Sequence, residues 1–200
     1  LAAGQPRIAI SAVLEQDERL EVLIVDDDSP DGTGKCADDL ALANPRVHVL
    51  HRAEKRGLGT AYIDGFSGGL ERNYTLFFEM DADLSHPPET LRAMLAELDH
   101  YDVVSGSRYL EGITVVNWPI ERILISYFGN AYVRRVTGLA ITDTTGGFRC
   151  VRREIFERIG IDRVRANGYA FQIELNFHLA RVGARVKEIP FYFVDRRRGV

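Results

Sequence analysis

The chain has 200 residues, 46% hydrophobic and 27% charged, which is enough apolar material for one sizeable core and argues against disorder. Its longest stretch without a charged residue, 123–133, is far shorter than the roughly 18 residues of a bilayer span, so no integral membrane segment is expected. The net charge of −4 hides an asymmetry: residues 1–100 carry 9 Lys and Arg against 19 Asp and Glu, whereas residues 101–200 carry 16 against 10.

This asymmetry suggests that the two halves of the chain bind different groups. An acidic half suits a cation. An arginine-rich half suits phosphate or an anionic lipid surface, because the guanidinium fork matches phosphate oxygens. The alternative is a chance segregation of charges on solvated faces.

Short apolar segments alternate with helical ones along the first half of the chain. Residues 20–27, 46–51, 74–80 and 101–107 are rich in β-branched or aromatic residues, as buried parallel strands are. Between them, 33–43, 57–70 and 88–98 have helical patterns. This alternation predicts one domain with a three-layer α/β/α fold and a mostly parallel, Rossmann-like central sheet.

Carboxylates gather where two of these predicted strands end. Asp26, Asp27 and Asp28 follow the first, and Asp81 and Asp83 follow the third. Ligands of such sheets lie outside the carboxyl ends of the strands, so both sets face one rim. A divalent cation, Mg²⁺ or Mn²⁺, offsets the repulsion and completes its shell with water and substrate phosphates. The alternative is that Asp81 or Asp83 only caps the following turn.

Other residue types narrow the class of protein. Cys36 and Cys150 lie far apart without metal-ligand spacing, which fits a reducing compartment. The first residues lack the pattern of a signal peptide. The "GLG" at 57–59 is too short for a dinucleotide fingerprint, which disfavours a dehydrogenase. The five histidines form no cluster, although His86 follows the D-x-D closely enough to line a site there. No nucleic-acid partner is expected.

Seven segments carry a resemblance to a known family: "VLIVDDDSPDGTG", "GLGTAYIDGF", "MDADLSHPPE", "VVSGSRY", "DTTGGFRC", "GYAFQIEL" and "EIPFYFVDRR". In this order, over nearly the whole chain, they resemble the family 2 glycosyltransferases of the GT-A fold, and among them the polyprenol-phosphate (dolichol-phosphate) mannose synthases. The resemblance implies a nucleotide- and metal-binding half at about 1–105 and an acceptor-binding half at about 106–200.

The resemblance also implies an activity and a donor site. Mannose would pass from GDP-mannose to the phosphate of a long-chain polyprenol, with inversion at the anomeric carbon and a divalent metal. Asp26 and Asp27 would bind the nucleotide sugar, Asp27 at the nucleoside. Asp81 and Asp83 would meet the metal and diphosphate, with Asp83 catalytic. Ser85 stands where some relatives place a metal-binding glutamine.

The chain departs from the family pattern at both ends. The family's first strand ends in a P-x-Y-N-E type motif that is missing here, and the chain starts almost directly in what resembles the helix that follows that strand. The first strand is therefore expected to be absent. Relatives also continue beyond "DRRRGV", so a further membrane segment or an accessory membrane subunit is left open.

A phosphate acceptor changes what the site needs. A phosphate monoester has a second pKa of about 6, so its attacking oxygen is already anionic and needs cations more than a general base. Glu174 stands where related enzymes with hydroxyl acceptors place a base; orienting an arginine or binding the sugar is the favoured alternative. The candidate acceptor-phosphate ligands are arginines, the first two also counted as catalytic: Arg108, Arg122, Arg149, Arg196 and Arg197.

Residues 119–136 form an amphipathic helical pattern beside Trp118. It is expected to lie in a membrane interface, with Arg134 and Arg135 near lipid head groups, which predicts a peripheral protein on the cytoplasmic side of a membrane. The alternative is a surface helix whose apolar side packs on the sheet.

Two other functions of the protein stay open. One is transfer from UDP-glucose or to another acceptor, and the other is a non-catalytic domain of the same fold.

Overall fold

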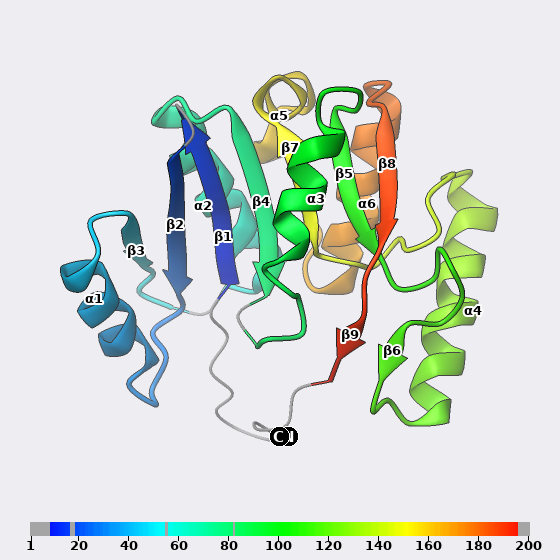
Figure 1. The fold of residues 1–200 in the computed structure, drawn as a ribbon, viewed down its shortest axis with the longest axis horizontal. Helices are drawn as coiled ribbons and strands as arrows, with labels where there is room; N and C mark the ends of the chain where they lie inside the picture. The colour runs from blue at the N-terminus through cyan, green and yellow to red at the C-terminus, as the bar shows by residue number, and fades with distance from the viewer. Residues whose placement is uncertain (1–8, 17–18, 55, 82, 196–200) are drawn as a thin grey trace.

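The computed structural model describes residues 9–16, 19–54, 56–81 and 83–195 (Figure 1). The strands are β1 (Ala9–Gln16), β2 (Arg19–Asp26), β3 (Val47–His51), β4 (Leu76–Asp81), β5 (Val103–Ser107), β6 (Val115–Val116), β7 (Arg149–Arg152), β8 (Val186–Pro190) and β9 (Phe193–Val194). The helices are α1 (Thr33–Ala43), α2 (Leu58–Glu71), α3 (Thr90–Glu97), α4 (Ile120–Thr137), α5 (Arg153–Ile159) and α6 (Tyr169–Arg181), with a 3₁₀ turn at Ile161–Arg163.

Seven strands form the central sheet in the order β3-β2-β1-β4-β7-β5-β8. Strands β2, β3, β4, β5 and β8 run in one direction, and β1 and β7 run against them. The predicted α/β fold with a mostly parallel sheet is therefore confirmed. A second, two-stranded parallel sheet pairs β6 with β9.

Residues 9–16 correct the expectation for the start of the chain. They form strand β1, not part of a helix, and β1 lies between β2 and β4, antiparallel to both. Ala9 pairs with Val25 on one side and with Asp81 on the other. The physical reason is backbone pairing, because without β1 the facing edges of β2 and β4 would have no hydrogen-bond partners. The central sheet thus has a strand at residues 9–16, where the sequence pattern indicated a helix.

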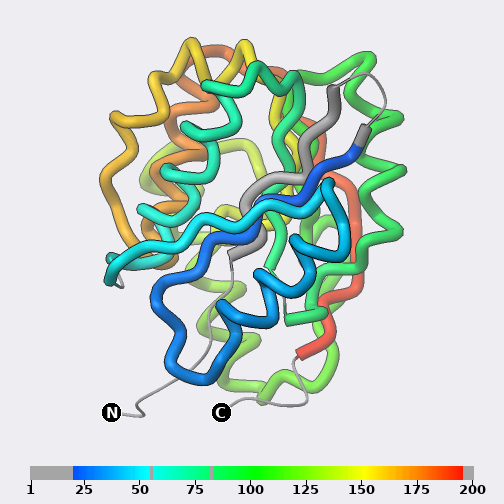
Figure 2. Tube along the Cα trace, turned by 90° about the vertical axis from the view of Figure 1, so that its left-hand side faces the viewer, coloured from blue at the N-terminus to red at the C-terminus, as the bar shows by residue number. Residues whose placement is uncertain are grey.

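Helices cover both faces of the sheet, α2, α5 and α6 on one and α3 on the other (Figures 1 and 2). Successive strand residues alternate between the two faces. Phe77 and Val103 join the core beneath α2, α5 and α6, whereas Phe78 and Val104 join the core beneath α3. Packing on both faces sets the positions of the strand ends, and therefore the places where the following loops begin.

The helix α4 differs from the others in its surroundings. It stands beside the β8 end of the sheet, next to the small β6–β9 sheet (Figure 1). Large apolar side chains cover its surface and are exposed, and Asn130 is its one buried residue. None of the helices in the described part of the chain has the length and apolar character needed to cross a bilayer.

Candidate functional site

A cavity of about 370 Å³ lies at the carboxyl ends of β4 and β5, between the sheet and α4. Its lining combines two carboxylates from the β4 end, two arginines and a group of aromatic rings. The residues that matter below are Asp81, Asp83, His86, Arg108, Trp118, Arg122, Tyr169, Phe191, Phe193 and Asp195. Opposite charges therefore face one another across an aromatic pocket.

Asp81 ends β4 and is held in place by two hydrogen bonds. Its Oδ1 accepts a hydrogen bond of 2.9 Å from the Tyr62 hydroxyl, and its backbone N–H donates to His86 Nδ1 at 2.9 Å. Burial, together with the Asp81 charge, raises the pKa of Tyr62 well above its ordinary value, so this hydroxyl stays a donor. The carboxylate is thus oriented by a neutral partner that leaves its charge in place.

Asp83 and Ser85 form a tight turn after Asp81. The Ser85 N–H donates to Asp83 Oδ1 at 3.0 Å, and the Ser85 hydroxyl donates to the same oxygen. Between them Leu84 has a left-handed φ of 65°. Asp83 therefore caps the turn and lines the cavity at the same time. Ser85 is buried beneath it, and its hydroxyl is used to orient Asp83.

The donor set of Asp81 and Asp83 fits a hard divalent cation. Both are half-buried, and both line the same cavity. Within the described ranges, no group of three or more His, Cys, Asp or Glu residues gathers to form a closed metal cage. Two carboxylates with the other positions left for water and substrate oxygens is the arrangement that Mg²⁺ and Mn²⁺ use at phosphate-transfer sites.

His86 lies under the carboxylates and packs on the aromatic pocket. Its ring stacks on Phe148, with centroids 4.7 Å apart and planes at 8°, and meets Phe191 and Phe193 edge-on. Burial lowers the pKa of His86 despite the nearby Asp81 charge, so the ring is neutral at pH 7. Because Nδ1 accepts from Asp81, the proton is on Nε2. The sequence indicated only that His86 lies near the site.

Arg108 follows β5 and is held by a bidentate ion pair. Its Nε and Nη2 donate to the two Asp143 oxygens, each at 2.7 Å, and Nη2 also donates to the Thr145 hydroxyl at 3.0 Å. The guanidinium carbon lies 5.6 Å from the ring centroids of Trp118 and Phe193. Arg108 is therefore almost immobile, with one side turned to the cavity.

Arg122, on α4, reaches the same cavity from the other side of Trp118. Its guanidinium carbon lies 3.9 Å from the Trp118 centroid, and its Nη1 donates to Asp195 Oδ2 at 2.9 Å. Its side chain stays 41% exposed, unlike that of Arg108. The structure thus brings two of the predicted phosphate-binding arginines together around one indole ring.

The structure does not bring Arg149 into the cavity. Arg149 is fully buried in β7, where it pairs with Glu79 at 3.3 Å and donates to Gln172, Asn176 and the Gly146 carbonyl. Burial raises the pKa of Glu79 to about 7, and the Arg149 charge opposes that shift. Arg149 is therefore assigned to the core instead of the predicted acceptor site, because its Nη1 and Nη2 donate to buried partners.

Arg196 and Arg197 lie outside the described residues. Glu174 is described, and it does not orient an arginine side chain in the structure. Its Oε2 accepts hydrogen bonds from the backbone N–H groups of Arg165 and Ala166, at 2.8 and 2.7 Å. Glu174 thus anchors the loop before α6 and is not part of the cavity lining.

Asp26 and Asp27 lie at the end of β2, separated from Asp81 by β1, and are not part of this cavity's lining. Both Asp27 oxygens accept from Arg52, at 2.5 and 2.7 Å. Asp26 is buried, with Oδ2 3.4 Å from His51 Nδ1, and its Oδ1 has no hydrogen-bond partner among the described residues. The carboxylates of the two strand ends therefore lie on one rim of the sheet, with strand β1 between them.

Several cavity residues were not singled out from the sequence. Tyr169, Phe191, Phe193 and Asp195 lie in segments that carried the family resemblance, so position in a motif was the available signal. Asn130 had no such signal, because the pattern of an amphipathic helix predicts that its polar residues are exposed to solvent. Its burial depends on a loop that the local pattern does not include.

Comparison with known proteins places this architecture in a family. The family model described as "Glycosyl transferase family 2" matches residues 7–160. The undecaprenyl-phosphate mannosyltransferase of Micrococcus luteus is 49% identical over 179 residues, covering 90% of this chain and 74% of that protein. The polyprenol monophosphomannose synthase of Mycolicibacterium smegmatis is 48% identical over 184 residues, covering 91% and 69%. The dolichol-phosphate mannosyltransferase of Pyrococcus furiosus is 37% identical, covering 90% and 49%.

Solved structures share the fold. A glucosyl-3-phosphoglycerate synthase from Mycobacterium tuberculosis, in complex with phosphoglyceric acid, superposes with a TM-score of 0.64 at 16% identity. The alignment covers 90% of this chain and 62% of that one. The same enzyme has been crystallised with Mn²⁺ and UDP-glucose, and that structure superposes with a TM-score of 0.62. These neighbours are GT-A glycosyltransferases, which confirms the predicted fold.

Proposed function

The chain belongs to glycosyl transferase family 2 and is a glycosyltransferase, and from this premise we propose that it transfers mannose from GDP-mannose to the phosphate of a polyprenyl phosphate lipid. The names of three relatives, all of which act on polyprenol-type phosphates, support the acceptor class and the sugar. The choice of GDP as the nucleotide rests on the family resemblance of the sequence motifs.

One observation carries the proposal: the cavity has carboxylates on one side and arginines around an indole on the other. We name the first group, Asp81 and Asp83, the acidic edge, and the second, Arg108, Arg122 and Trp118, the arginine side. The acidic edge suits the cation-bound diphosphate of a nucleotide sugar. The arginine side suits a second phosphate, that of the acceptor. A transferase that joins a sugar to a phosphate needs both.

The geometry gives each side a part in the reaction. Arg108, fixed by Asp143, and Arg122, fixed by Asp195, would hold the acceptor phosphate with one anionic oxygen directed at the anomeric carbon. A new bond from this oxygen to the anomeric carbon forms as the bond to the diphosphate breaks on the opposite face, which inverts the configuration. A bound divalent cation would supply Lewis-acid stabilisation of the leaving diphosphate. No general base is needed, which agrees with Glu174 binding backbone amides instead of lining the cavity.

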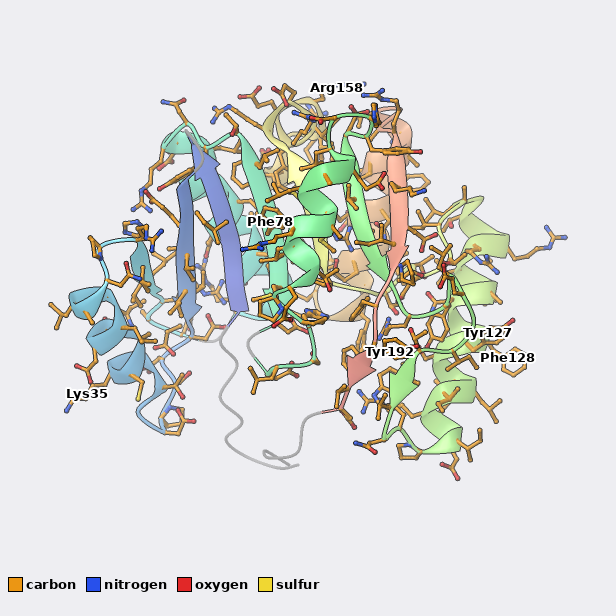
Figure 3. All side chains as sticks on the ribbon, viewed as in Figure 1. Lys35, Phe78, Tyr127, Phe128, Arg158 and Tyr192 are labelled. Atoms are coloured by element: carbon orange, nitrogen blue, oxygen red, sulfur yellow. The ribbon has the colours of Figure 1, made fainter. Side chains whose placement is uncertain are left out.

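Contact with a membrane is the second part of the proposal, since a polyprenyl tail stays in the bilayer. The exposed apolar residues of α4 support it: Ile120, Leu124, Ile125, Tyr127, Phe128, Tyr132 and Val136. In Figure 3, Tyr127 and Phe128 point outward from α4, away from the sheet. The apolar side of α4 therefore does not pack on the sheet, and of the seven residues just named only Ile125 also lines the cavity. A solvent-exposed helix surface with this many apolar residues is characteristic of an interaction site.

A transfer assay tests the activity. The protein is incubated with detergent-solubilised polyprenyl phosphate, Mg²⁺ or Mn²⁺, and labelled GDP-mannose or UDP-glucose, and label is counted in the lipid phase. We expect label from GDP-mannose alone, and its loss on chelation. Label from UDP-glucose would contradict the donor assignment. No label from either donor, with nucleotide binding intact, would favour a non-catalytic domain.

A further inference from the structure

The helix α4 has two sides with different roles. Arg122, Ser126 and Asn130, spaced four residues apart, line the cavity, while the exposed apolar residues other than Ile125 do not. On the cavity side, polar side chains of α4 form hydrogen bonds with other parts of the molecule. The Ser126 hydroxyl accepts from the Tyr109 hydroxyl at 2.6 Å, and Arg122 binds Asp195.

Asn130 is the most buried of these three polar residues. It is 3% exposed, and within α4, which the structure describes in full, it is the one buried residue. Its Oδ1 accepts two hydrogen bonds of 2.7 Å, from the backbone N–H and the hydroxyl of Thr144. Its Nδ2 donates to the Ser126 carbonyl at 2.9 Å. A single amide thus binds both its own helix and a loop.

That loop, residues 142–147, which we name the cavity loop, holds Arg108. Thr144 lies between Asp143 and Thr145, and these two neighbours accept the hydrogen bonds of the Arg108 guanidinium. Thr144 is fully buried, and its carbonyl accepts from Asn176 at 3.0 Å. A shift of Thr144 would therefore act on both partners of Arg108, opposed at Asp143 by Glu188, which accepts from the Asp143 N–H at 3.0 Å.

Asparagine is well suited to this position. One side chain must accept from two donors and also donate to a carbonyl, and an amide does both without charge, with its acceptor and its donor on separate atoms. Aspartate would lose the donor and place a second negative charge near Asp143. A leucine of similar volume would leave the two Thr144 donors without a partner, which is costly for buried groups.

We propose that Asn130 is a positioning residue for the acceptor phosphate, acting through the cavity loop to set the place and angle of the Arg108 guanidinium. The inference rests on the proposed function, because it assigns Arg108 to the acceptor. It gives α4 a second role in the acceptor site, beside that of Arg122, through a residue whose hydrogen bonds go to Ser126 and Thr144. Asn130 should accordingly affect acceptor binding and leave donor binding unchanged.

The test compares Asn130→Leu with a pair at the other end of the contact, Thr144→Val and Thr144→Ser. KM is measured for farnesyl phosphate, a short soluble isoprenyl phosphate, and for GDP-mannose, and the fold is checked by circular dichroism and Tm. We expect Asn130→Leu to raise the farnesyl phosphate KM about tenfold, and Thr144→Val to raise it less, because the backbone hydrogen bond remains. Thr144→Ser keeps the hydroxyl and should stay near wild type. The KM for GDP-mannose should change less than about twofold in each.

A double mutant separates positioning from general destabilisation. If Asn130 acts through Arg108, then Asn130→Leu adds little to the farnesyl phosphate KM of an Arg108→Gln enzyme, so the two effects are not additive. Equal rises in both KM values, or full additivity with Arg108→Gln, would overturn the proposal. Should Asn130→Leu fail to fold, the Thr144→Val and Thr144→Ser pair decides by the same criterion. A wild-type enzyme that transfers mannose to no isoprenyl phosphate would instead overturn the proposed function, and this inference with it.

Discussion

The acidic edge and the arginine side of the cavity hold their charges in different ways. At the acidic edge, Asp81 and Asp83 accept from neutral groups, the Tyr62 hydroxyl and the backbone and hydroxyl of Ser85, which orient a carboxylate without cancelling its charge. On the arginine side, Arg108 is paired with the carboxylate of Asp143. The carboxylates of the acidic edge are thus oriented by neutral donors, whereas Arg108 on the arginine side is oriented by an ion pair.

A second contrast, between Arg108 and Arg149, shows what makes an arginine available. Both are buried next to a carboxylate at adjacent strands, β5 and β7. Arg149 is enclosed by Glu79, Gln172 and Asn176, while Arg108 keeps one side on the cavity. A charge pair alone therefore does not indicate a binding residue; the position of the open side does.

The largest expected effect is at the acidic edge. Asp83→Asn removes a charge from the cavity and keeps the shape of the side chain, so we expect transfer to fall about a thousandfold with the circular dichroism spectrum unchanged. Asp39→Asn, on the exposed surface of α1, is the control and should transfer normally. Retained transfer in Asp83→Asn would remove the D-x-D from the mechanism.

The arginine side should show a smaller effect. Arg108→Lys keeps the charge but loses the bidentate fork to Asp143, so we expect the acceptor KM to rise about 30-fold, with the donor KM unchanged. Arg185→Lys is a matched control, because Arg185 forms the same bidentate pair with Asp102 on the exposed surface. If lysine serves as well as arginine at position 108, the fork has no role in acceptor binding.

The outer side of α4 is predicted to contribute to lipid binding. Replacing Phe128 and Tyr132 by serine removes two large exposed side chains, and we expect binding to vesicles with anionic lipids to fall about tenfold in a sedimentation assay. Leu42→Ser, on α1, removes an apolar residue elsewhere that is even more exposed, and it should have no effect. Equal losses in both proteins would show that the attraction is not specific to α4.

The smallest effect concerns stability near the end of β2. Hydrogen bonding to Asp38, with a smaller contribution from Asp26, raises the pKa of His51 above 6.5, although burial opposes the shift. A raised pKa means that folding favours the protonated ring, so this stabilisation is present below pH 6.5 and is lost as the pH rises through the folded-state pKa. His51→Gln should remove this part of the pH dependence of stability, measured as Tm against pH. The free energy of unfolding involved is less than about 1 kcal/mol, because the pair is half exposed. His100→Gln, on an exposed turn, should leave the dependence intact.

Local patterns predicted the elements that local forces determine. Helix α1 has the bounds that the sequence predicted, Thr33–Ala43, and the predicted strands agree with β2 to β5 within two residues at each end. The amphipathic pattern also identified α4, whose exposed apolar side the structure confirms at Ile120, Leu124, Tyr127 and Phe128, with Ile123 and Ala131 half-buried.

The rest depends on contacts between distant segments. Strand β1 was missed because its place between β2 and β4 is decided by the edges of those strands and not by its own pattern. Arg149 was predicted to bind the acceptor phosphate because it lies in a motif of the family. Its partners Glu79 and Asn176, which bury it, come from β4 and α6 and are distant in the sequence. The cavity residues Phe191 and Phe193 follow β8 and meet Arg108 and His86 only in three dimensions.

The small β6–β9 sheet has a consequence for synthesis of the chain on the ribosome. Thr114 bonds the Phe191 carbonyl across 77 residues, and Arg122 bonds Asp195 across 73. The acidic edge, by contrast, is closed by residues that are made close together, such as Tyr62 and Asp81. A nascent chain therefore carries the D-x-D turn well before it can enclose Trp118, and its arginines and indole stay open to solvent and to chaperones until the last described strand emerges.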